Sequence, residues 1–309
     1  MSYPYLSDAL KALTGLDVPL PLPTFGLCVG GAMLVAAGFF RRELQRMRVA
    51  GECPPVKPRP RDGSPLPVEG KQGLDEFVST FAFVVLLSGI VGARIFHILE
   101  HLPEFLADPW PMIFSRSGLS IMGGLILGTF AGIWAVRRAG LPLRPVLDAA
   151  APPMMIGYGL GRIGCQISGD GDWGKAADMV LKPDWLPTWL WAQTYDNNIY
   201  GAVIPAPGVY PTPIYETAMA LLLFGLLWAI RRHPFRKGWL FAVYLLLAGA
   251  ERLLIEQIRV NPVLDVVGIR ATQAEMIAGL FTVLGLAGIV LLSRRDPPPA
   301  GPLPAQASL

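Results

Sequence analysis

Charged residues are scarce in this 309-residue chain: Asp, Glu, Lys and Arg together make up 16% of it, against about 25% in a typical soluble domain. Hydrophobic residues make up 52%, and the mean hydropathy is +0.45. The formal net charge is only +3, and we expect no nucleic-acid partner. The composition excludes an ordinary soluble domain and predicts an all-α integral membrane protein, with residues 1–309 forming a single polytopic membrane domain.

Cysteine is also rare. Cys28, Cys53 and Cys165 are too few and too scattered for a disulfide framework or a cysteine metal knuckle, and we expect no metal and no other cofactor. The opening residues, MSYPYLSDALKALTG, lack the basic start, the short apolar core and the cleavage site of a secretory signal. The first membrane span is therefore expected to be retained.

Long apolar runs are abundant. A helix needs about 20 mostly apolar residues to cross a bilayer, and six runs qualify: 24–40, 75–99, 118–136, 214–230, 238–258 and 271–292. A seventh run, 145–165, is interrupted by Asp148, Pro152 and Pro153, which is typical of a helix that packs inside the protein and lines a cavity. A re-entrant or kinked helix is the alternative for this run.

The distribution of Lys and Arg predicts the orientation, because cytoplasmic loops retain positive charge. With seven spans, the segments on one side (41–73, 137–144, 231–237 and the tail after 292) hold seventeen basic residues, and the other side holds six. Counting only six spans would place the basic loops on opposite faces. We therefore expect seven transmembrane helices, with the N-terminus outside and the C-terminus in the cytoplasm.

Two connecting segments have a distinct composition. Residues 41–73 are predicted to form a cytoplasmic, proline-rich basic loop that meets anionic lipid head groups. Residues 166–213 are rich in Trp, Tyr and Pro and lie on the outer side in the predicted topology. Because aromatic rings favour the head-group level of a membrane, we interpret this segment as an external cap, with an ordinary aromatic belt as the alternative.

Several arginines lie within or at the ends of these apolar runs. Charges in a membrane are costly and usually face a cavity, so they are candidates for function. Arg94, Arg162 and Arg252 occupy three separate spans, and their forked guanidinium donors match phosphate oxygens. Glu256 and Arg259 follow Arg252 at the i+4 and i+7 positions of one helix face. We predict a site for a lipid phosphate; charges that only link helices are the alternative.

The stretch GRIGCQISGDGDWG, residues 161–174, admits several local chemistries. A calcium loop is disfavoured because the glutamate of the full ligand pattern is missing, and a phosphate loop would need a lysine and a hydroxyl residue. Cys165 as a nucleophile is an alternative, but a cysteine in a membrane segment is more often a packing residue. Gly123 and Gly124 indicate close helix packing, with close approach of a lipid to the backbone as the other interpretation.

Taken in order, five stretches resemble the prolipoprotein diacylglyceryl transferase family: VGARIFHILEHLPEFLADP at 91–109, SGLSIMGGLILG at 117–128, GLGRIGCQISGDGDWG at 159–174, YPTPIYE at 210–216 and ERLLIEQIR at 251–259. The resemblance implies a multi-pass enzyme of the bacterial inner (cytoplasmic) membrane, with the cap in the periplasm. It also implies transfer of the diacylglyceryl group of phosphatidylglycerol to the lipobox cysteine of a prolipoprotein signal peptide, with release of glycerol 1-phosphate.

Carried over by motif, the resemblance implies roles for individual residues. Arg162 and Arg252 would contact the lipid phosphate, and Glu256 and Arg259 would orient them. Tyr215 and Glu216 would line the site. Arg94, Gly123 and Gly124, singled out above from the apolar runs themselves, complete the predicted substrate-binding set.

Two positions depart from the family pattern. The family usually has His-Gly-Gly where this chain has Met122, Gly123 and Gly124, and it usually has asparagine where Cys165 stands. The thioether of Met122 takes no proton. We therefore predict that Asp170 or Asp172 replaces the histidine as the proton acceptor, because desolvation can raise the pKa of a carboxyl group near the interface; His97 and His101 are alternatives.

Two other functions stay open at this point. The first is a lipid-binding or lipid-modifying paralogue of the same fold with another acceptor or head group. The second is a transporter of an anionic solute, which is less favoured because no inverted repeat is visible in the sequence.

Overall fold

A computed structural model describes residues 2–20, 22–53, 71–114, 120–266 and 269–294. Within these residues the chain forms ten α-helices and one two-stranded sheet. The chain divides into two compact units, one comprising Met1–Phe39 with Ala150–Leu309 and the other comprising Phe40–Ala149. Each unit is described by itself.

All seven predicted runs form helices, six of them close to the predicted bounds; the run 24–40 forms a longer helix that continues to Val49. They are α2 (Thr24–Val49), α3 (Lys71–Glu100), α6 (Ile121–Arg138), α7 (Leu143–Ser168), α8 (Thr212–Ile230), α9 (Trp239–Glu256) and α10 (Gln273–Leu292). Four of them, namely α2, α3 over Gly73–Glu100, α8 and α10, are long and apolar enough to cross a membrane by length and composition alone. The prediction of a helical protein of membrane type is confirmed.

Helix α7 contains the interrupted run. It continues through Pro152 and Pro153 as one helix of 26 residues, about 39 Å at the usual rise per residue. Asp148 is buried in it, at 4% exposure. The run is therefore a single long helix, but it is not among the four helices that are long and apolar enough to cross a membrane.

The unit Phe40–Ala149 is built around the pair α3 and α6. Their backbones meet closely at Gly92 and Gly123, where a Cβ on either residue would overlap the carbonyl group of the other. Two short helices follow α3, namely α4 (Leu102–Ala107) and α5 (Pro109–Phe114). The predicted basic loop is shorter than 41–73, because α2 continues to Val49 and α3 begins at Lys71; most of the remainder, 54–70, lies outside the described residues.

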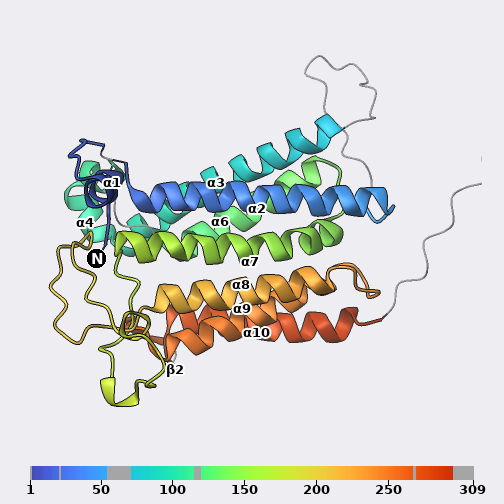
Figure 1. The fold of residues 1–309 in the computed structure, drawn as a ribbon. Coiled ribbons are helices and arrows are strands. Elements are labelled where there is room, and N and C mark those ends of the chain that lie inside the picture. Colours follow the sequence, from blue (N-terminus) through green and yellow to red (C-terminus); the bar gives the residue numbers. More distant parts are fainter. Residues whose placement is uncertain (1, 21, 54–70, 115–119, 267–268, 295–309) are drawn as a thin grey trace, which may run out of the picture. The chain divides into compact units, whose positions relative to one another are not determined.

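In the other unit, α8, α9 and α10 lie side by side (Figure 1), after a short N-terminal helix, α1 (Leu6–Thr14). Buried apolar side chains from α7, α8 and α9 form one core cluster: Ala151, Met155, Ala220, Leu227, Leu240 and Tyr244. Helix α7 meets α8 where the Thr217 hydroxyl donates to the Gly159 carbonyl at 3.1 Å. This packing fixes the ends of α7, α8 and α9, which carry the charged residues of interest.

Glycines let α9 and α10 approach closely, and we expect Gly249→Ala to destabilise this pair. A Cβ at Gly249 would lie 2.7 Å from the carbonyl oxygen of Ala278, and overpacking of this kind costs about 1–3 kcal/mol. Gly279 in α10 is the matched control, because a Cβ there meets nothing within 4 Å and alanine favours the helix by about 0.5–1 kcal/mol. Thermal unfolding in detergent, followed by circular dichroism, should show a lowered midpoint for Gly249→Ala only; equal midpoints would contradict the packing argument.

The segment predicted as a cap connects α7 to α8 over residues 169–211, slightly inside the predicted 166–213, because the two helices extend into that range. It contains two single-turn 3-10 helices, Met179–Leu181 (η1) and Thr188–Leu190 (η2). Isolated backbone bridges join Ala176 and Gln193 to Val209. A short antiparallel hairpin, β1 (Val263–Val266) and β2 (Ile269–Thr272), connects α9 to α10.

Candidate functional site

A fully buried carboxylate, Glu216, lies among three arginines. It sits near the start of α8 with 0% of its side chain exposed. Arg162, near the end of α7, reaches it with Nε 2.6 Å from Oε2. From the end of α9, Arg252 Nη1 lies 3.2 Å from Oε1, and Arg259 Nη1, just beyond the helix, lies 3.3 Å from the same oxygen. A carboxylate buried in this way requires paired charges, and the three guanidinium groups supply them.

Asp172 forms a second bridge between two of these arginines, because its two carboxylate oxygens accept from Arg162 and Arg259. The cap holds Asp172 in place. The hydroxyl of Thr212 donates to the Asp172 carbonyl at 2.6 Å, and the Gly174 amide donates to the Tyr210 carbonyl at 2.9 Å. The turn after α7 is therefore joined to the start of α8, which brings an aspartate of the cap to the helix ends.

Glu256 forms an ion pair with Arg252, with Oε2 3.0 Å from Nη2. Its other oxygen accepts from Thr272 Oγ1 at 2.6 Å and from Asn261 Nδ2 at 2.7 Å. The sequence allowed Glu256 to pair with an arginine on either side. Because α9 ends at Glu256, Arg259 leaves the helical face and pairs with Glu216 and Asp172 instead.

The cluster balances three arginines against three carboxylates, Asp172, Glu216 and Glu256. Each guanidinium group is thereby held in a fixed orientation. Arg162 also stacks over the Tyr158 ring, at 5.1 Å from its centroid, and the Tyr158 hydroxyl donates to Glu251 at 3.3 Å. Among the described buried atoms, Nε of Arg259 has no hydrogen-bond partner. This N–H is a donor that an entering anion can use without displacing a carboxylate.

The two aspartates of the cap have pKa values displaced in opposite directions. Burial raises the pKa of Asp170, and the negative charge of Asp172 raises it further. Burial would also raise the pKa of Asp172, but Arg162 and Arg259 lower it to about 2. One oxygen of Asp170, Oδ1, is buried without a hydrogen-bond partner. Paired carboxyl groups with separated pKa values are typical of acid–base sites, and Asp170 is the one suited to accept a proton.

We expect Asp172→Asn to lower the free energy of unfolding by about 2–3 kcal/mol at pH 7, because a shift from the ordinary pKa of about 3.9 to about 2 corresponds to that energy. The folded-state pKa is depressed, so this stabilisation is present above about pH 4 and is lost as the pH falls towards 2. Unfolding measured in detergent between pH 7 and pH 2 should show the two proteins converging in acid. A difference independent of pH would show that the charge of Asp172 is not its source.

Cys165 lies one turn after Arg162 on α7, with its sulfur 3.7 Å from Nη1 of that arginine. It is buried at 6% exposure, and its sulfur lies within 4.8 Å of carboxylate oxygens of Asp170 and Asp172. Burial among these side chains agrees with its interpretation as a packing residue.

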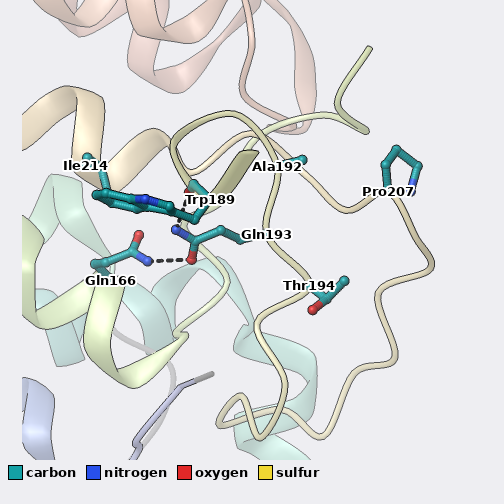
Figure 2. A pocket seen from close by; sticks show the side chains of 7 residues that line it. All are labelled: Gln166, Trp189, Ala192, Gln193, Thr194, Pro207 and Ile214. Atoms are coloured by element: carbon teal, nitrogen blue, oxygen red, sulfur yellow. Dashed lines mark hydrogen bonds between the residues drawn. The ribbon is translucent and has the colours of Figure 1, made fainter. Parts of the chain in front are cut away.

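A pocket of about 500 Å³ is lined by residues of the cap and of the facing ends of α7 and α8. Figure 2 shows its lining: Gln166, Trp189, Ala192, Gln193, Thr194, Pro207 and Ile214. Gln166 Nε2 donates to Gln193 Oε1 at 2.7 Å, and the Tyr195 hydroxyl donates to Gln166 Oε1 at 2.8 Å. Gln166 follows Arg162 by one helical turn, so these two residues lie on one face of α7.

Sequence reasoning did not single out Gln166, Gln193 or Tyr158. The i+4 spacing from Arg162 was a usable signal for Gln166, and the i−4 spacing was one for Tyr158. The pairing of Gln166 with Gln193 had no such signal, because it depends on how the cap folds back.

The other predicted site residues have different surroundings. The hydroxyl of Tyr215 donates to the Leu190 carbonyl at 2.6 Å, which ties α8 to the cap. Arg94, Gly123 and Gly124 belong to the unit Phe40–Ala149. There Arg94 donates to the Met112 carbonyl at 3.1 Å, and Gly123 and Gly124 face α3. The structure thus brings together Arg162, Arg252, Arg259, Asp172, Glu216 and Glu256.

The fold and the site define a membrane protein of the type that carries an arginine–carboxylate cluster where several long helices end under a cap. The chain belongs to the prolipoprotein diacylglyceryl transferase family, whose model matches residues 12–291. Several relatives carry the name phosphatidylglycerol–prolipoprotein diacylglyceryl transferase. The protein of Corynebacterium glutamicum is 28% identical over 87% of this chain and 80% of its own length. The protein of Corynebacterium efficiens is 29% identical over 93% of this chain and 83% of its own length. That of Leptospira interrogans is 32% identical over 57% of this chain and 59% of its own length.

Proposed function

We propose that this protein transfers the diacylglyceryl group of phosphatidylglycerol to the lipobox cysteine thiol of a prolipoprotein and releases glycerol 1-phosphate. The observation that carries the proposal is the buried cluster in which Arg162, Arg252 and Arg259 surround Glu216 and Asp172. The names of the relatives support the choice of lipid and acceptor. The proposed location is the bacterial inner membrane.

The proposed topology has seven spans, α2, α3 and α6 to α10, with the N-terminus outside and the C-terminus in the cytoplasm. Each of these helices has 18 residues or more. The excess of seventeen basic residues over six on the two sides supports the orientation. In this topology the cap and the arginine cluster lie at the periplasmic side, where a secreted precursor is accessible.

The arginines perform the electrostatic part of the reaction. The lipid phosphate accepts hydrogen bonds from Arg162 and Arg252. Glu256 and Arg259 orient these two arginines, and Tyr215 and Glu216 line the site. Guanidinium groups that are already oriented in a buried site bind the phosphate there. They stabilise the negative charge that develops on it as it leaves. In the transfer step, the thiol sulfur bonds to the glyceryl carbon, and the bond from that carbon to the phosphate oxygen breaks. The electron pair leaves with glycerol 1-phosphate.

Asp170 accepts the thiol proton in this proposal. A thiol is a weak nucleophile until it loses its proton, and Met122 takes none. Asp170 is the better of the two cap aspartates for this role, because its pKa is raised whereas that of Asp172 is about 2. The neighbouring pocket, with Gln166 and Gln193 as polar groups, binds the peptide segment that carries the lipobox cysteine.

The test is a transfer assay with purified protein in vesicles of phosphatidylglycerol and a mass-tagged lipobox peptide. The peptide should gain the mass of a diacylglyceryl group, and glycerol 1-phosphate should be released in equal amount. A peptide with serine in place of the lipobox cysteine and vesicles of phosphatidylcholine alone are the controls. The absence of any gain, under conditions in which a relative such as the Corynebacterium glutamicum enzyme modifies the peptide, would overturn the proposal.

A second candidate function is that of a paralogue that binds or modifies an anionic lipid with another acceptor. Met122 favours it, because this side chain removes an acid–base group that the family usually has. Anionic lipid would then copurify with the protein and be lost from Arg162→Ala or Arg252→Ala, without any modified lipobox peptide. Growth of a transferase-depleted strain only with the Met122→His variant would also point to this paralogue.

A further inference from the structure

Two histidines and a glutamate converge at the end of α3. One ring nitrogen of His97, one of His101 and one carboxylate oxygen of Glu100 all lie within 4.8 Å of one another. The two imidazole centroids are 4.5 Å apart. The spacing accounts for this, because residues three and four positions apart share a helix face. All three residues belong to the unit Phe40–Ala149.

Hydrogen bonds already orient two of the three side chains. Nδ1 of His101 lies 3.1 Å from the carbonyl oxygen of His97. Because a carbonyl oxygen only accepts, Nδ1 carries the proton, and the lone pair of Nε2 is left for a ligand. The hydroxyl of Ser120, which is itself buried, donates to Oε1 of Glu100 at 2.9 Å. Side chains that bind a metal ion are typically oriented by such hydrogen bonds. The histidine donates its other N–H to a carbonyl group, and the carboxylate accepts from a nearby donor.

We propose that His97, Glu100 and His101 bind a divalent transition metal ion of the zinc class, with water completing the coordination. Two imidazole nitrogens and one carboxylate oxygen are a donor set that zinc accepts and that calcium and magnesium, which prefer oxygen ligands, do not. Ligand bonds of about 2.0–2.2 Å would bring the three ligand atoms to roughly 3.3 Å from one another. His97 and His101 are half-buried and Glu100 is exposed, so side-chain rotation can supply this contraction. The scarcity of cysteine argues against a thiolate site, but this donor set needs none.

The ion would join the last turn of α3 to the start of α4. His101 directly precedes α4, and its carbonyl accepts from the Phe105 amide at 3.0 Å. Ser120, which holds Glu100, directly precedes α6. The site therefore joins the end of α3 to the start of α4, and the hydrogen bond from Ser120 to Glu100 links it to the start of α6. Its existence does not depend on the transfer reaction.

The test is metal binding to the purified full-length protein, stripped with a chelator and titrated with Zn²⁺ in a calorimeter and with Co²⁺ in a visible spectrometer. One equivalent of ion should bind, and Co²⁺ should give a visible absorption band. The double variant His97→Ala/His101→Ala should lose both signals, and Glu100→Gln, which still accepts a hydrogen bond from Ser120, should bind at least tenfold more weakly. Zn²⁺ should raise the thermal midpoint of the unsubstituted protein more than that of Glu100→Gln.

Two controls separate this site from other ligands in the chain. His233→Ala removes the remaining histidine. Cys165→Ser alters a second group that could hold an ion among the described residues, namely Cys165 with Asp170 and Asp172. Both should bind the ion as the unsubstituted protein does. No binding to that protein, or binding that survives Glu100→Gln and the double variant but is lost in Cys165→Ser, would overturn the assignment. If the double variant fails to fold, Glu100→Gln decides the question.

Discussion

Glu216→Ala should be among the most damaging single substitutions in this protein, with a loss of about 3–5 kcal/mol in the free energy of unfolding. Glu216 is fully buried and is the shared partner of Arg162, Arg252 and Arg259. Removal of one partner from a buried ion pair leaves uncompensated charge, and the cost is of this order. Here three guanidinium groups would face one another with only Asp172 and Glu256 to balance them.

The measurement is denaturant or thermal unfolding in detergent, together with the transfer assay. Glu216→Gln separates charge from shape: it keeps the volume and one carbonyl acceptor, and we expect it to recover part of the stability but not the transfer activity. Glu251→Gln in α9 is the matched control, since Glu251 is also buried, at 5% exposure, but contacts the neutral hydroxyl of Tyr158. A loss no larger for Glu216→Ala than for Glu251→Gln would show that Glu216 does not organise the cluster.

Much of the fold could be predicted from the sequence because it follows from local patterns. The apolar runs are long, so all seven form helices, and only the end of α2 lies far from its predicted bound. The extents of the two connecting segments were less accurate, because α2, α3, α7 and α8 extend into them. Where such polar helix ends stop depends on packing and capping, and the spacing of apolar residues does not show it.

The site could be predicted in part. Arg162 and Arg252 stood out because charge inside an apolar run is rare and costly, whereas Glu216 entered only through the resemblance to the family. The bridge from Asp172 to Arg162 and Arg259 was not predicted, because it depends on the turn after α7 and on the end of α9 at Glu256. Contacts between residues far apart in sequence are set by tertiary structure, and no local pattern encodes them.

Asp170→Asn should lower kcat by about 10²–10⁴-fold, the range that a positioned general base contributes, while anionic lipid still binds. Asparagine has nearly the same shape but takes no proton, and the arginine contacts of the cluster are made by Asp172 and the two glutamates rather than by Asp170. The matched control is Asp184→Asn, an exposed aspartate of the same cap, which should leave the rate unchanged. Retained activity in Asp170→Asn would remove Asp170 from the mechanism and return attention to His97 and His101.

The pH dependence of kcat/KM tests the same role independently. A base acts only when unprotonated, so the rate should fall about tenfold per pH unit below the pKa of Asp170. That pKa is raised by burial and by the charge of Asp172. The bend in the plot of kcat/KM against pH should therefore lie above the ordinary carboxyl pKa of about 3.9. Asp172→Asn removes the neighbouring charge, so any activity that it retains should show the bend at lower pH. A bend that stays in place in Asp172→Asn, or that persists in Asp170→Asn, would assign the titration to another group.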